Sequence, residues 1–171
     1  MTWTAPTPDP VDGPLTGEDR PILEGFLNWE RRTLLNICAG LTADQLASRP
    51  LASSNLSLLG LVRHVAKVER FWFRLRAAGQ DIEPMYDPAL GKDADFDDVD
   101  AAQAESDFDR LQTEWRLADE GVAGMEFDDT FEVGDRVFSL RMMYVHLIAE
   151  YSRHNGHADL LRESIDGVTA R

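Results

Sequence analysis

The chain has 171 residues, of which 43% are hydrophobic, and its formal net charge at pH 7 is −14. This length suits one domain that closes a hydrophobic core. The surplus of acidic residues argues against nucleic acid and anionic membrane surfaces as partners, because both attract Lys and Arg. No apolar run approaches the roughly 20 residues of a membrane-spanning helix, so we expect no membrane partner.

Cys38 is the single cysteine, which excludes an internal disulfide and favours a reducing cytoplasm. Residues 1–15 are rich in Pro and Thr and lack periodicity, which predicts an extended N-terminal arm that is loose or lies on the surface. The arm has neither the basic residues nor the apolar block of a secretory signal. Residues 16–171 are expected to form the single domain.

Apolar residues recur at helical spacing in several segments, and each segment has residues typical of helix ends. A capping box at residues 42–45 predicts one short helical turn between the first two long helices. The four long helices are expected over about residues 18–39, 57–78, 98–119 and 140–165.

The connections between these helices are of unequal length. Residues 80–97 form the longest unpatterned stretch and predict a long crossover loop between the second and third helices. The acidic run over residues 93–100 lacks the spacing of a calcium loop and predicts a solvated loop and helix start. Residues 130–138 predict either a small hairpin or an irregular connector before the last helix. Together these features predict an all-α four-helix bundle.

Ionisable side chains interrupt the apolar face of the fourth helix, where they require partners because an unpaired buried charge is costly. His146, Glu150, His154 and His157 all fall on the side that faces the predicted core. His64 lies inside the apolar stripe of the second helix. Two helices therefore direct imidazoles towards the bundle axis, and imidazole with carboxylate is a donor set that suits zinc and other divalent ions.

Helix geometry restricts which of these residues share one ion. His146 and His154 are eight residues apart, roughly 12 Å along a helix, so they do not both ligate it. The pairs His146 with Glu150, Glu150 with His154, and His154 with His157 remain open, each completed by His64. We favour Glu150 with His154. His157 and His146 are then candidates for the groups that hydrogen-bond and orient a ligand.

The layout resembles the DinB-like superfamily of metal-binding bundles, which has a His in the second helix and two ligands four residues apart in the fourth. The run His154-Asn155-Gly156-His157 sets the register of that resemblance, although Glu150, Asn155 and His157 depart from the general pattern. The His, Glu, His set is similar to that of mycothiol-dependent maleylpyruvate isomerases. Residues 60–69 with Phe71-Trp72 resemble the second helix of the actinobacterial mini-circle branch.

The resemblance implies a divalent metal, zinc first and nickel or iron as alternatives, held by His64, Glu150 and His154. It implies a thiol transferase or isomerase that activates a low-molecular-weight thiol such as mycothiol towards a small electrophile. A metal-dependent hydrolase and a non-enzymatic, stress-linked metal-binding protein are the alternative hypotheses. Relatives often pair, so the resemblance also allows a homodimer.

Overall fold

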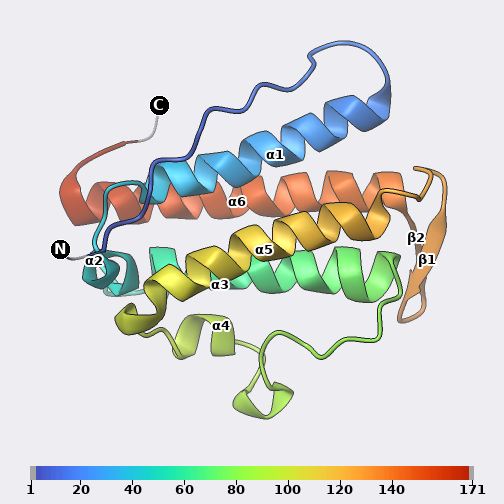
Figure 1. Ribbon diagram of the computed structural model, residues 1–171. Coiled ribbons are helices and arrows are strands. Elements are labelled where there is room, and N and C mark those ends of the chain that lie inside the picture. The colour runs from blue at the N-terminus through green and yellow to red at the C-terminus, as the bar shows by residue number, and fades with distance from the viewer. Residues whose placement is uncertain (1–2, 170–171) are drawn as a thin grey trace.

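The computed structural model describes residues 3–169 and is mostly helical, with one small two-stranded sheet. Four long helical stretches run side by side (Figure 1). They are α1 (Asp19–Cys38), α3 (Leu58–Glu69) continued by η1 (Arg70–Ala77), α5 (Ala104–Val122) and α6 (Leu140–Asp166).

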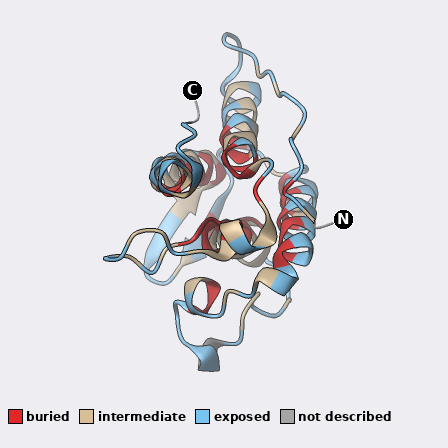
Figure 2. Cartoon of the chain, turned by 90° about the vertical axis from the view of Figure 1, so that its left-hand side faces the viewer, coloured by how far each residue is buried: buried red, intermediate tan, exposed pale blue. Residues whose placement is uncertain are grey.

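The hydrophobic core lies where these helices face one another. Helix α1 packs against α6, α3 packs against α5, and α3 also contacts α6. The buried sides of the helices point inward in the end-on view (Figure 2). Each long helix contributes a leucine whose exposure is 0%, namely Leu34, Leu61, Leu111 and Leu147. Burial of such a side chain is worth about 1.5–3 kcal/mol, so the apolar stripes hold the helices together.

The second long helix differs from its prediction in its last two turns. It is α-helical only as far as Glu69, and η1 has the wider hydrogen bonding of a π-helix. Apolar periodicity over two turns does not separate the two helix types, which explains why the sequence indicated one continuous α-helix. π-helical segments are frequent near functional sites.

The crossover between α3 and α5 contains short helices that the sequence did not indicate. They are η2 (Pro88–Leu90), α4 (Ala94–Asp97) and η3 (Ala101–Gln103). The third long helix was expected from residue 98 but begins at Ala104, because the Asp100 side chain caps η3 instead. The prediction of a wholly solvated acidic loop is wrong, since Asp95 is only 1% exposed.

The connector before α6 is the hairpin rather than an irregular segment. Strands β1 (Thr130–Val133) and β2 (Arg136–Ser139) are antiparallel, with Val133 opposite Arg136 across the turn. Gly134 supplies the turn with a φ of 64°, a conformation that glycine adopts without strain.

The start of the chain is tied to the segment that joins α1 to α2 (Ala43–Ala47). Ala5 donates a 2.9 Å hydrogen bond to the Leu41 carbonyl and accepts one of 2.9 Å from Gly40. The capping box of Thr42 and Gln45 forms as predicted. Within residues 3–169, no helix has the length and hydrophobicity needed to cross a membrane.

Candidate metal centre

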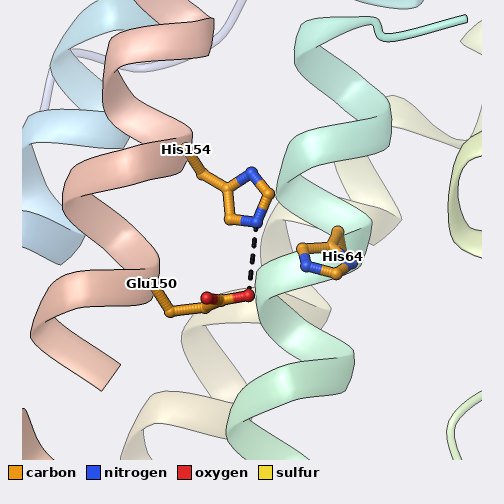
Figure 3. A group of neighbouring side chains, drawn as sticks. All are labelled: His64, Glu150 and His154. Atoms are coloured by element: carbon orange, nitrogen blue, oxygen red, sulfur yellow. Dashed lines mark ion pairs between the residues drawn. The ribbon is translucent and has the colours of Figure 1, made fainter. Parts of the chain in front are cut away.

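His64, Glu150 and His154 come together between two helices. One donor atom from each residue lies within 4.8 Å of the donor atoms of the other two. Glu150 and His154 project from adjacent turns of α6, and His64 faces them from α3 (Figure 3). The predicted group is therefore present as a spatial cluster, and only the contact between α3 and α6 brings it together.

Glu150 has a partner on each side. His154 Nε2 lies 3.6 Å from Glu150 Oε1, the spacing expected of residues four apart on a helix. Arg153 Nη1 lies 3.0 Å from Glu150 Oε2, and its own side chain is 60% exposed. The carboxylate thus has one oxygen towards the cluster and one towards a cation at the surface.

His154 is held in its neutral form. Burial lowers the pKa of His154 to about 4, and the neighbouring His64 adds to this effect while Glu150 opposes it. A neutral imidazole keeps the lone pair that ligation of a metal requires. The His154 and His64 ring centres are 4.6 Å apart, so two nitrogen donors are available in one small volume.

His64 is fixed by a residue that the sequence did not single out. Its Nδ1 lies 2.7 Å from Oδ2 of Asp95, on α4. The Lys67 ammonium donates a 2.9 Å hydrogen bond to the other oxygen, Oδ1. Burial raises the pKa of Asp95, but hydrogen bonds from His64 and Lys67 outweigh it and the pKa is lowered overall. Asp95 is therefore an ionised acceptor beside the cluster.

Sequence reasoning missed Asp95 because it is one of several aspartates in a short acidic run. Spacing alone does not indicate which of them turns inward. The sequence feature that comes nearest to indicating an inward-facing aspartate is the pair of cations on α3, Arg63 and Lys67, which hold α4 in the structure. Arg63 donates to the backbone carbonyls of Ala94 and Asp95, and Lys67 donates to the Asp95 carboxylate.

The two remaining histidines are not members of the cluster. The His157 ring centre is 5.5 Å from that of His154, and His157 Nδ1 has no hydrogen-bond partner among the described residues. The His146 ring packs edge-on against Trp72 at 4.7 Å. An orienting role for either residue stays a prediction.

With this geometry in place, comparison with known proteins identifies the family. The family described as Mycothiol-S-transferase matches residues 22–167. The chain belongs to this family. The match confirms the resemblance to the DinB-like superfamily and to its mycothiol-related members. The matched range contains all three residues of the cluster, and no curated protein matches the sequence.

In this member of the mycothiol-S-transferase family, hydrogen bonds between buried side chains outside the cluster join the long helices. Arg31 of α1 donates from Nε and Nη2 to the two oxygens of Glu69, at 2.8 Å each. Tyr151 donates a 2.9 Å hydrogen bond to Glu69 and accepts one of 2.8 Å from Trp115. These side chains join all four long helices, and they place a buried contact between α3 and α6 directly beside Glu150.

A cavity of about 260 Å³ opens along α3 and η1, starting at Lys67, one turn beyond His64. Its lining is largely apolar and includes Val68, Phe71 and Trp72. A larger cavity of about 540 Å³ lies between residues 11–15 and α1, and none of its lining residues belongs to the cluster. No cluster residue lines the smaller cavity either, but it lies along α3, the helix that carries His64.

Proposed function

We propose that this protein is a metal-dependent mycothiol S-transferase, in which His64, Glu150 and His154 hold one divalent ion, zinc in the first instance, on a DinB-like four-helix bundle. The observation that carries the proposal is the cluster itself, in which His154 is buried and His64 and Glu150 are partly buried. His64 Nε2 is buried and has no hydrogen-bond partner among residues 3–169, and His154 Nε2 lies 3.6 Å from Glu150 Oε1. Buried polar atoms of this kind need a partner, and a metal ion supplies one for an imidazole nitrogen.

The donor set fits such an ion. Two imidazoles and one carboxylate are typical protein ligands of catalytic zinc, which leave a fourth position open. Donors that share one zinc ion with bonds of about 2.0–2.1 Å stand roughly 3.4 Å apart. Glu150 and His154 already have a separation of 3.6 Å, and the full cluster spans 4.8 Å, so small side-chain rotations close the difference.

The residues of the chain prepare the site for thiol chemistry. When bound, a divalent ion stabilises the thiolate of a ligating thiol, and the thiolate is the nucleophile. His154 keeps its lone pair because burial lowers its pKa to about 4. Arg153 balances part of the Glu150 charge from the surface, with Nη1 3.0 Å from Oε2.

The cavity beside α3 is a candidate site for the apolar part of the electrophile. The two cationic side chains that line this cavity already have carboxylate partners, since Lys67 donates to Asp95 and Arg70 donates to Glu114. The lining that remains for a ligand is apolar, with Val68, Phe71 and Trp72 among its residues. A small apolar electrophile is therefore better suited to this cavity than a multiply charged one.

The proposal is tested by following thiol conjugation of a small alkyl halide. Metal-free protein, zinc-reconstituted protein and zinc-reconstituted His64→Ala protein are compared, with and without mycothiol. We expect conjugation only where both zinc and mycothiol are present, and loss of it in His64→Ala. Nickel- and iron-loaded samples test the metal preference. Turnover that ignores mycothiol would instead indicate a hydrolase, and zinc binding without turnover of any electrophile would favour a binding protein.

A further inference from the structure

We propose that Asp95 is a positioning residue of the metal centre, which fixes both the tautomer and the ring orientation of His64 from the crossover helix α4. The inference rests on the proposed metal-binding role of His64. It assigns a function to a segment, residues 94–97, that contributes no member of the cluster itself.

The hydrogen bond determines which nitrogen of His64 is available. The Asp95 carboxylate acts as a hydrogen-bond acceptor, because it forms an ion pair with the Lys67 ammonium, which lies 2.9 Å from Oδ1. His64 Nδ1, at 2.7 Å, is therefore the donor and carries the proton. In a neutral ring the lone pair is then on Nε2, the buried nitrogen without a partner among the described residues. A carboxylate on the far nitrogen of a ligating His is a recurrent arrangement in metal sites.

Asp95 is itself held from several directions. Its side chain is 1% exposed, and each carboxylate oxygen has a cationic or imidazole partner. Arg63 Nε donates a 2.9 Å hydrogen bond to the Asp95 carbonyl, and Arg63 Nη2 donates one of 3.1 Å to the Ala94 carbonyl. The carboxylate is fixed relative to α3 before any metal arrives, as a preformed site requires.

The same short helix also holds the plane of the His64 ring. Phe96 stacks on His64 with ring centres 4.9 Å apart and an interplanar angle of 27°. Gly60 makes this approach feasible, because a Cβ there would stand 3.1 Å from Phe96 Cδ1. Helix α4 thus constrains His64 through one hydrogen bond at the ring edge and one stacking contact on the ring face.

The first test reads the tautomer directly and needs no metal. Long-range nitrogen–proton NMR spectra of the metal-free protein are recorded at about pH 9, well above the ordinary imidazole pKa of about 6.5. The chain has four histidines, and the His64→Ala variant assigns the signals of His64. We expect the Nδ1–H tautomer in the wild type and a shift towards Nε2–H in Asp95→Asn. A wild-type His64 in the Nε2–H form overturns the proposal, whether or not the variant folds.

The second test measures metal affinity by competition with a chromophoric zinc chelator. We expect Asp95→Asn to bind zinc about 10–100-fold more weakly than the wild type, the usual effect of removing an orienting partner. Asp98→Asn is the matched control, because Asp98 is an exposed aspartate of the same run, and it should bind like the wild type. Circular dichroism confirms that each variant is folded.

The outcomes separate this inference from the proposed function. Unchanged affinity and an unchanged tautomer in folded Asp95→Asn protein overturn the positioning role while the metal centre stands. Failure of the wild type to bind zinc overturns the metal centre, and with it the orienting role of Asp95. A loss of stability in Asp95→Asn with neither tautomer nor affinity altered would show that the residue serves the fold alone, and so would contradict the proposal.

Discussion

Arg31 and Glu69 form a bidentate ion pair with two hydrogen bonds of 2.8 Å, and their side chains are 2% and 0% exposed. The pair joins α1 to α3, and Tyr151 extends it to α6. Because Tyr151 follows Glu150 directly, this buried contact fixes α6 against α3 at the height of the cluster. The Tyr151–Glu69 hydrogen bond thus adds a buried contact between α3 and α6, the two helices that carry the cluster.

Replacement of Glu69 by Gln is expected to lower the free energy of unfolding by about 3 kcal/mol or more. The substitution leaves the Arg31 charge buried with Asp119 as its one carboxylate partner among residues 3–169, and breaking a buried pair typically costs about 3–5 kcal/mol. Urea unfolding followed by circular dichroism measures the change.

The control for this variant is Glu120→Gln. Glu120 also pairs with an arginine, Arg116, at 2.9 Å, but the two side chains are 59% and 60% exposed. An exposed pair four residues apart contributes about 0.5 kcal/mol or less. Equal losses of unfolding free energy in the two variants would show that burial does not increase the contribution of the Arg31–Glu69 pair to stability.

Gly60→Ala is expected to loosen α4 and weaken zinc binding several-fold. A Cβ at this position would stand 3.0 Å from Ser57 Oγ and 3.1 Å from Phe96 Cδ1, so Phe96 has to move away from His64. Amide hydrogen exchange over residues 94–97 should become faster in the variant. Chelator competition and exchange mass spectrometry check both effects.

Gly156→Ala supplies the contrast, because Gly156 lies in α6 and a Cβ there would have no heavy atom within 4 Å. We expect this variant to be more stable by about 0.5–1 kcal/mol, the usual gain for Ala over Gly in a helix, with wild-type zinc affinity. If Gly60→Ala and Gly156→Ala showed the same exchange and affinity, the close contact of α4 with α3 would have no bearing on the site.

Cys38 is expected to make the protein less stable as the pH rises above about 9. Burial raises the pKa of the folded-state thiol to about 12 from its ordinary value of 9.0. Between these values the unfolded chain releases the thiol proton and the folded chain retains it. The free energy of unfolding therefore falls with increasing pH, by up to about 1.4 kcal/mol per unit.

Denaturant unfolding of the wild type and Cys38→Ala between pH 7.5 and pH 10.5 isolates this contribution, because all other titrating groups are shared. The wild-type curve should fall more steeply above about pH 9. Parallel curves would contradict a buried, protonated thiol. The same burial predicts that the folded protein reacts with thiol reagents only as fast as it opens.

Patterns within single helices could be interpreted from the sequence, which is why the long helices and the cluster were predicted. The apolar stripes locate the four helices, and an i, i+4 spacing links Glu150 to His154 on one face. The choice of His64 as their partner used the same reasoning, since it is a histidine inside an apolar stripe. These inferences depend on local geometry and on the cost of burying polar groups, both of which are readable from residue types.

Pairings between distant segments could not be interpreted in this way. Asp95 is one aspartate of an acidic run, and only the fold of α4 against α3 turns it towards His64. No local pattern predicts burial of Glu69, which depends on Arg31, 38 residues away. The π-helical hydrogen bonding after Glu69 likewise leaves no distinct apolar period in two turns. Contacts and hydrogen bonding that form only in the folded chain decide all three features.

The most direct test of the proposed metal centre is the metal content of purified protein after reconstitution with zinc and removal of the excess. We predict about one equivalent in the wild type, close to none in His64→Ala and His154→Ala, and the wild-type amount in His146→Ala, whose ring packs against Trp72 outside the cluster. A wild type without bound zinc, or a His64→Ala variant that retains as much zinc as the wild type, would contradict the proposed centre.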